Sequence, residues 1–259
     1  MGGSEVTVTL NAGSAWLTID REAARNTLSV SVITGLLQAL EQAETDAQVR
    51  SVVLTGAGAR VFSGGGELSG MSGDGFLAGH EARRLFGVLL LRLQNLRKPT
   101  LARINGHALA GGLGLVLACD LAVASADAAL ATPEISRGLF PMMVTALLQR
   151  HLGRKRALEL LLTGERITAD KALSWGLVNR VVPAAELDAA TNELASMLNA
   201  KSQAVMSLGR RAYFTAEDLP VMQALEYLNS QLSLNLLTED TAEGVTAFLE
   251  KREPKWVDR

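Results

Sequence analysis

Two apolar repeats alternate along the first half of the chain. Residues 6–10 and 15–19 alternate apolar and polar side chains, which predicts a β-hairpin. Residues 51–55, 100–104 and 121–125 are compact apolar runs, typical of buried strands. Helical spacing fills most of the segments between them. This order predicts an α/β fold built from parallel ββα or βαβ units.

The first expected helix begins after Ser29, a good N-cap, and carries Ile33, Leu36, Leu37 and Leu40 on one face. A further helix carries Leu85, Val88, Leu89 and Leu93. The remaining helices are expected at residues 113–119, 154–163, 169–175, 186–198, 202–214 and 221–236.

From about residue 142 the pattern becomes mainly helical, with one short strand predicted at residues 179–182. Asp240 and Glu243 have capping-box spacing and should open the last helix. No Gly/Ser linker is visible, so the change of class near residue 200 is expected within one compact protein.

Composition narrows the class of protein. The net charge of −2 over 259 residues lacks the basic excess that is typical of nucleic-acid-binding proteins. Cys119 is the single cysteine and lies in an apolar run, so a buried, inert thiol in a reducing compartment is expected. The N-terminal residues resemble no secretory signal, and Asp120 interrupts the longest apolar region, so we expect a cytoplasmic protein without a membrane partner.

Two glycine-dense segments are the candidate chemistry. Residues 62–68 contain Gly64, Gly65 and Gly66, and residues 105–112 end in Gly111 and Gly112. Glycine allows a backbone to approach a ligand closely, and two N–H groups that converge on one oxygen form an oxyanion hole. The alternative is a pair of tight turns at sheet edges.

An ordered set of motifs resembles the crotonase superfamily, the enoyl-CoA hydratases and isomerases, over nearly the whole chain. In order they include Asn26-x-Leu28, Val53-Leu-Thr-Gly56, Phe62-Ser63, Gly66-Glu67-Leu68, Lys98-Pro99, Asn105-Gly106-x-Ala108-x-x-Gly111-Gly112, Cys119-Asp120, Pro133-Glu134-Ile135, Gly138-Leu139-x-Pro141, Leu162-Thr-Gly164, Gly176-Leu-Val-Asn179 and Glu243-Gly244.

The resemblance implies a crotonase-like spiral of ββα units at residues 1–200 and a helical trimerisation region at residues 201–259. It also implies a homotrimer or a dimer of trimers, an acyl-CoA thioester as substrate and no separate cofactor. Gly66 and Gly111 would donate the two oxyanion N–H groups. The candidate substrate and CoA contacts are Arg25, Gly64, Leu68, Phe248 and Lys251, the last two reaching a neighbouring subunit; a solvated arginine is the alternative for Arg25.

Glu134 matches the main acid/base glutamate of the family, and Pro133 fixes the backbone before it. The alternative is a solvated surface carboxylate. Two-carboxylate hydratases of the family have a second glutamate three residues after the oxyanion glycine, and that position is Gly114 here. One glutamate suffices to move a proton between C2 and C4, so double-bond isomerisation is favoured over hydration. An acyl-CoA decarboxylase and a non-catalytic acyl-CoA-binding subunit remain alternatives.

Several further residues either differ from the family motifs or lie near the candidate site in the sequence. Glu67 replaces the usual aspartate and either has a structural role or leans into the site. Residues 142–144 (Met-Met-Val) either reshape the acyl pocket or pack a helix. Residues 70–79 could form a lid or a plain connection. His107 is expected either to pack or to lie next to the pantetheine of CoA rather than act as a base, and no spacing suggests a metal site.

Overall fold

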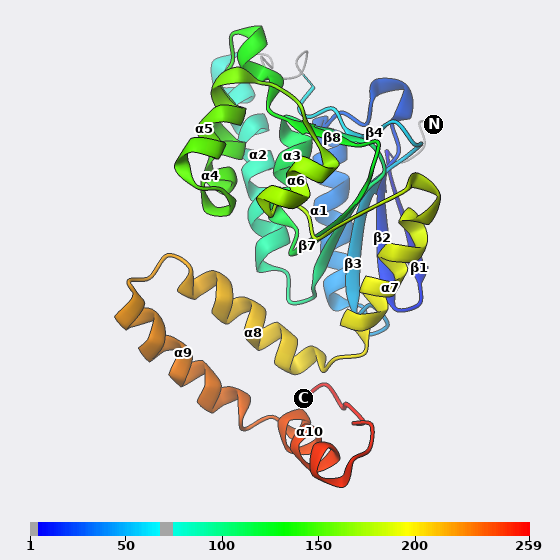
Figure 1. Ribbon diagram of the computed structural model, residues 1–259, viewed down its shortest axis with the longest axis vertical. Coiled ribbons are helices and arrows are strands. Elements are labelled where there is room, and N and C mark those ends of the chain that lie inside the picture. The colour runs from blue at the N-terminus through cyan, green and yellow to red at the C-terminus, as the bar shows by residue number, and fades with distance from the viewer. Residues whose placement is uncertain (1–4, 68–74) are drawn as a thin grey trace.

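The computed structural model describes residues 5–67 and 75–259, which form two sheets covered by helices, with a helical extension at the C-terminus (Figure 1). The larger sheet has the order β1-β2-β3-β5-β7-β10, in which only β1 is antiparallel to its neighbour. Its strands are β1 (Val6–Asn11), β2 (Ser14–Ile19), β3 (Ser51–Gly56), β5 (Thr100–Ile104), β7 (Leu121–Ser125) and β10 (Arg180–Val182).

Strand β3 shows why the apolar runs form the centre of this sheet. Val52 and Leu54 face the main core, whereas Val53 faces a second cluster with Leu187 and Leu194. Alternate side chains point to opposite faces of a strand, so a strand covered on both sides must be apolar throughout. The continuous apolar run is therefore explained by helices on both faces.

Helices α1 to α3 pack on the main-core side, and α7 covers the opposite face. The Ser29 side chain accepts a hydrogen bond from the Val32 N–H at 3.1 Å, which confirms the predicted cap of α1. The helices are α1 (Val30–Thr45), α2 (Phe76–Asn95), α3 (Gly111–Ala118), α4 (Met142–His151), α5 (Arg154–Thr163), α6 (Ala169–Trp175), α7 (Leu187–Asn199), α8 (Gln203–Ala216), α9 (Val221–Asn235) and α10 (Glu239–Glu250).

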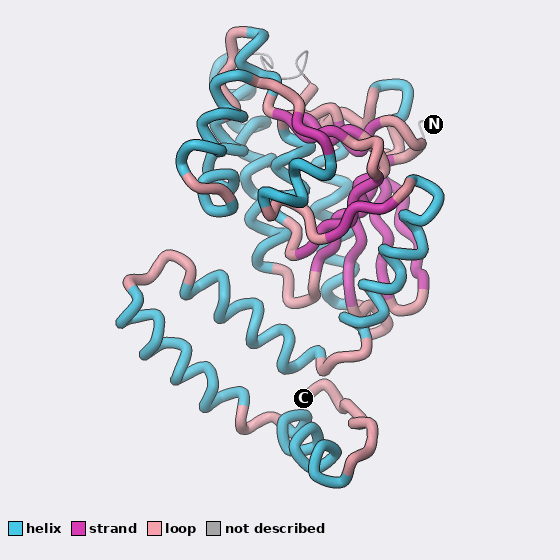
Figure 2. Tube along the Cα trace, viewed as in Figure 1, coloured by secondary structure: helices cyan, strands magenta, loops and turns pink. Residues whose placement is uncertain are grey.

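A second, smaller sheet was not predicted from the sequence. It has the order β4-β6-β8-β9, with β4 (Val61–Ser63), β6 (His107–Leu109), β8 (Ala129–Ala131) and β9 (Ile167–Thr168). The first three strands are mutually parallel. The glycines of the first segment therefore follow β4 rather than β3, and the second segment contains β6. Figure 2 shows this small sheet above the larger one.

Two buried asparagine side chains fix the loop that leads from β3 into β4. Asn26 Nδ2 donates to the carbonyl oxygens of Ala57 at 3.0 Å and Val61 at 2.7 Å. Asn105 accepts from the Gly56 N–H at 3.1 Å and donates to the Gly58 oxygen at 2.9 Å. Backbone groups that lack a ladder partner are thus satisfied by side chains. These bonds hold the smaller sheet against the larger one.

Helices α8, α9 and α10 extend from the core as a separate layer (Figure 1). Arg210 on α8 anchors it through a two-pronged ion pair with Asp120, at 2.7 and 2.8 Å. Helix α9 buries none of its residues and exposes an apolar stripe. The stripe consists of Val221, Leu225, Leu228, Leu232 and Leu236.

The capping prediction for the last helix was wrong. The cap of α10 is Thr238, whose side chain accepts from the Thr241 N–H at 3.1 Å. Asp240 is buried and instead accepts from the N–H groups of Val257 and Asp258 and from the Ser202 hydroxyl. Asp240 therefore ties the C-terminal tail and the start of α8 to α10.

Candidate active site

The carboxyl ends of three parallel strands gather the main candidate residues. Gly66 follows β4, Gly111 follows β6, and Glu134 follows β8. The register pairs Ser63 with Ala108 and Leu109 with Ala131. Because parallel strands end at the same edge of a sheet, all three residues lie on one edge of the smaller sheet.

The two glycine turns touch through their backbones. Gly65 has φ of +87°, and a side chain there would bring its Cβ within 2.5 Å of the Ala110 Cβ and 2.9 Å of the Gly111 nitrogen. A contact under 3 Å cannot form without displacement, so this crossing requires glycine. Ala110 itself has φ of +53°, a strained conformation for alanine. The convergence that the sequence suggested is therefore present.

The Gly66 and Gly111 N–H groups lie beside this contact between the two turns. A Cβ on Gly111 would stand 3.6 Å from the Gly66 nitrogen. Within residues 5–67 and 75–259, neither N–H has a hydrogen-bond acceptor. Gly111 begins α3, where the first N–H groups have no partner in the helix and carry the positive end of the helix dipole. This arrangement can bind an anionic oxygen.

Glu134 lies in a short 3₁₀ helix, Pro133–Arg137, with Pro133 at its first position. Its Oε2 is buried and has no hydrogen-bond partner in the described part of the chain. Burial raises the pKa of this carboxyl above its ordinary value, although a hydrogen bond from its own backbone and the charge of Arg137 act in the opposite direction. Glu134 is therefore not a solvated surface carboxylate but a partly desolvated one, poised to take up a proton.

The described side chains nearest to Gly114 are apolar. A Cβ there would lie 3.2 Å from Phe86 Cζ and 3.3 Å from Val144 Cγ2. Sequence reasoning missed Phe86, which had no signal beyond its place in an apolar helix.

The Glu67 carboxylate is paired with Arg21. One of its carboxylate oxygens lies 3.5 Å from Arg21 Nη1, and the same guanidinium is paired with Glu5 at 2.7 Å. Glu67 thus has the structural contact that was one of its two expected roles.

Two of the expected CoA contacts lie next to the first turn. The Gly64 N–H donates to the Arg25 carbonyl at 2.9 Å, and Arg25 is exposed with a left-handed φ of +57°. Leu68 lies outside the described residues, as do residues 70–74 of the proposed lid segment. Gly79 was placed in that segment, but it is a buried residue of α2.

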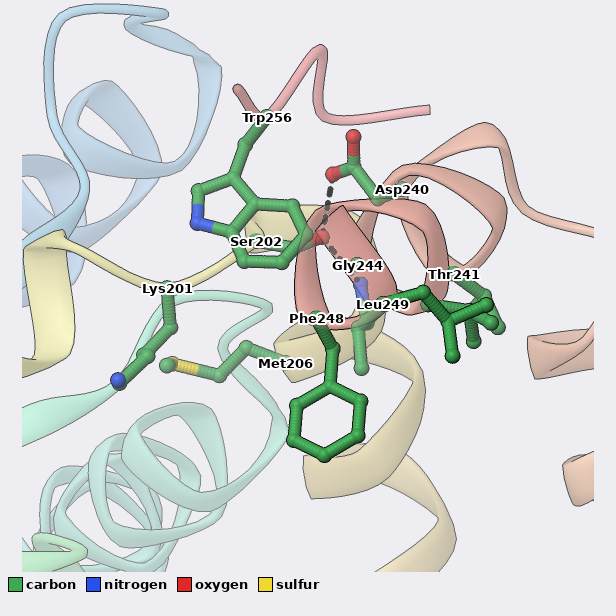
Figure 3. Close-up of a pocket in the computed structure, with 11 residues that line it drawn as sticks. Lys201, Ser202, Met206, Asp240, Thr241, Gly244, Phe248, Leu249 and Trp256 are labelled. Carbon is green, nitrogen blue, oxygen red and sulfur yellow. Dashed lines mark hydrogen bonds between the residues drawn. The ribbon is translucent and has the colours of Figure 1, made fainter. Parts of the chain in front are cut away.

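Phe248 and Lys251 are not brought to the turns within one chain. Both belong to the α10 end of the molecule, whereas β4 and α3 lie at the opposite end (Figure 1). Phe248 lines a cavity of about 530 Å³ between α8 and α10, together with Met206 and Trp256 (Figure 3). This apolar cavity is therefore separate from the glycine turns.

The remaining candidates have structural contacts. His107 Nδ1 accepts from the Ala129 N–H at 3.2 Å, and burial lowers the pKa of its imidazole, so the neutral ring links β6 to β8. Burial raises the pKa of the Cys119 thiol, in agreement with an inert cysteine. Met143 on α4 lies 3.8 Å from where Gly87 would carry a Cβ, so it packs α4 against α2.

The comparisons with known proteins agree with this architecture. The sequence model of the enoyl-CoA hydratase/isomerase family matches residues 9–259. A short-chain-enoyl-CoA hydratase of Clostridium acetobutylicum is 33% identical over 239 residues, 92% of each chain. Human enoyl-CoA hydratase domain-containing protein 3, mitochondrial, is 37% identical over 90% of this chain and 77% of its own. The crystal structure of an enoyl-CoA hydratase from Bacillus anthracis superposes with a TM-score of 0.93 at 30% identity, covering 98% of this chain and all of that one.

The chain therefore belongs to the enoyl-CoA hydratase/isomerase family. The expected crotonase-like α/β fold and the assignment to an enzyme class of this family are confirmed. No helix in the described part of the chain is long and apolar enough to cross a membrane.

The contact between the two turns predicts that alanine substitutions at the adjacent Gly65 and Gly66 have different effects on stability. Gly65→Ala should lower the free energy of unfolding by about 2 kcal/mol or more, because the new methyl group collides with Ala110 at a positive φ. Gly66→Ala is the matched control: its Cβ would meet nothing within 4 Å, so it should change stability by less than about 0.5 kcal/mol. Urea unfolding measures both, and equal costs would contradict the backbone contact.

Proposed function

We propose that the chain is an acyl-CoA enzyme that stabilises a thioester enolate and moves a proton with one glutamate. The observation that carries the proposal is the pair of Gly66 and Gly111 N–H groups, which have no acceptor among the described residues and lie at the same sheet edge as Glu134. Two preorganised backbone donors stabilise an oxyanion where its charge develops, and one such donor contributes about 3 kcal/mol in comparable sites. The chemistry requires no separate cofactor.

The favoured reaction is isomerisation of a 3-enoyl-CoA to a 2-enoyl-CoA. The ionised Glu134 removes a proton from C2, and the electron pair forms the enolate held by the Gly66 and Gly111 N–H groups. The double bond then moves from C3–C4 to C2–C3 as the protonated Glu134 returns the proton to C4. Partial desolvation of Glu134 supports this role because a base with a raised pKa is matched to the weakly acidic C2 proton.

Hydration is the less favoured reaction because water must be activated as well. Gly114 has no side chain, and its neighbours Phe86 and Val144 carry no base. Glu67 is engaged by Arg21. Glu134 is thus the one carboxylate for which the described contacts support a role in proton transfer.

We propose two groups of CoA contacts, one beside the first glycine turn and one at the α10 end of the molecule. Arg25, Gly64 and Leu68 adjoin the first turn in sequence or space, and the exposed Arg25 offers a charge for a phosphate. Phe248 and Lys251 would serve a neighbouring subunit, since Phe248 is 82% exposed and both belong to the opposite end of their own chain.

The direct test supplies a 3-enoyl-CoA and a 2-enoyl-CoA separately. We expect conversion of the first to the 2-enoyl-CoA and slow water addition to the second. Glu134→Gln should reduce turnover by about 100-fold or more, since it removes the base while keeping the shape of the side chain. Hydration at an ordinary enzymatic rate would overturn the preference for isomerisation, and near wild-type turnover by Glu134→Gln would overturn the role of Glu134.

The pH dependence follows from the raised pKa of Glu134. Because the base must be ionised, kcat/KM should rise with pH through a midpoint above the ordinary glutamate value of about 4.3. Ionisation of Glu134 costs the folded state stability as pH rises from the unfolded pKa to the folded one. Glu134→Gln should therefore be no less stable than the wild type at pH 7, as thermal unfolding would verify. An acid limb at or below the ordinary value would contradict the desolvated base.

We further propose a homotrimer or a dimer of trimers that covers the apolar stripe on α9. Five large apolar residues exposed on one helix face are typical of an interaction surface. Light scattering should give three or six chain masses for the wild type, and Leu225→Glu/Leu232→Glu should reduce the mass. Ser230→Glu, on the opposite side of the same helix, is the control. A monodisperse wild-type monomer would contradict the assembly.

A further inference from the structure

The aromatic ring of Phe86 lies against the start of helix α3, where the candidate oxyanion donor is located. Its Cζ atom stands 3.2 Å from the place where a Cβ would project from Gly111, and 3.2 Å from the corresponding place at Gly114. Residues three apart on a helix share one face, so a single ring edge covers both positions. Phe86 comes from α2, a helix remote in sequence from either glycine.

The space beside Gly114 is closed on its other side by Val144 on α4. Val144 Cγ2 lies 3.3 Å from where a Gly114 Cβ would stand, and Gly114 is buried. Leu28 contributes a third apolar side chain, with its Cδ1 3.3 Å from where a Cβ would project from Gly111. A Cβ at residue 114 would therefore require the Phe86 ring or the Val144 side chain to shift by a few tenths of an ångström. A carboxylate among these apolar side chains would be desolvated.

Phe86 is nevertheless not wholly enclosed. The ring is only partly buried, although it packs against the main core, and it adjoins the residue whose N–H is free. A partly exposed apolar ring beside an anion-binding backbone group can contact the substrate as well as the core. The side chains nearest to Gly114 in the described part of the chain, Phe86 and Val144, are apolar and cannot orient a water molecule.

We propose that Phe86 is the specificity-determining residue of this site, an inference that rests on the proposed function. Its ring fills the space that a second carboxylate would need, keeps water from this side of the bound thioester, and selects an apolar acyl segment next to the reacting carbons. The reaction is thereby restricted to proton transfer by Glu134. The lack of a carboxylate at residue 114 and the presence of the Phe86 ring thus act together to disfavour hydration.

The test compares Phe86→Ala, Gly114→Glu and the double variant with the wild type. Gly114→Glu alone should lower Tm by about 5 °C, because the new side chain is forced against Phe86. In the double variant the two losses should not add, because removal of the ring makes room for the carboxylate. Val88→Ala, alone and with Gly114→Glu, is the matched control: Val88 lies on the same helix but is exposed, so its effect should add.

The second measurement is water addition to a 2-enoyl-CoA, which places hydrogen on C2 and hydroxyl on C3. We expect the double variant to hydrate at least about tenfold faster than either single variant, since a general base contributes on that scale or above it. Additive Tm changes for the Phe86 pair, or hydration no faster in the double variant than in Gly114→Glu, would overturn the inference. Wild-type inactivity on the 3-enoyl-CoA would instead count against the proposed function, and the Tm comparison, which needs no substrate, separates the two failures.

Discussion

The close approach of two backbone turns is the constraint on which the rest of the site depends. Gly65 can lie against Ala110 and Gly111 only because it has no side chain and adopts a positive φ. This contact sets the spacing of the Gly66 and Gly111 N–H groups, and the strained Ala110 backbone is held in place by the Ala131 carbonyl at 2.9 Å. The same hydrogen bond joins the second turn to the strand that leads to Glu134. Anion binding and proton transfer are thus built from one short piece of sheet.

That piece of sheet depends on the larger one for its rigidity. Strands of three residues form too few ladder bonds to be stable alone. Asn26 and Asn105 supply what is missing by bonding the loop between β3 and β4 from both sides. The apolar strands β3, β5 and β7, buried on both faces, give these amides a fixed base. The positions of the candidate catalytic groups at the edge of the smaller sheet therefore depend on the packing of the larger sheet.

Sequence patterns predicted most of the elements that carry helical spacing or a compact apolar run, although α4 was not among the individually expected helices. The ends of β5, β7, α5 and α6 agree with expectation, whereas β4, β6 and β8 were missed since three residues cannot display a period of two. Thr238 rather than Asp240 caps α10 because Asp240 has partners in the C-terminal tail that no local pattern reveals. Phe86 was missed for the same reason: its contact with Gly114 arises from the packing of α2 on α3. Apart from the convergence of the two glycine turns, contacts between elements distant in sequence were not predicted.

Backbone donors have a consequence for how such a site can change over generations. An N–H group belongs to the main chain, so no substitution except proline deletes it, whereas every side chain around it can be exchanged singly. The N–H groups of Gly66 and Gly111 therefore survive most substitutions at their own positions as long as Gly65 keeps the turns in contact, whereas the side chains of Phe86, Val144 and Leu28 can each be exchanged. The same backbone anion site can in this way support different reactions when the side chains around it are substituted.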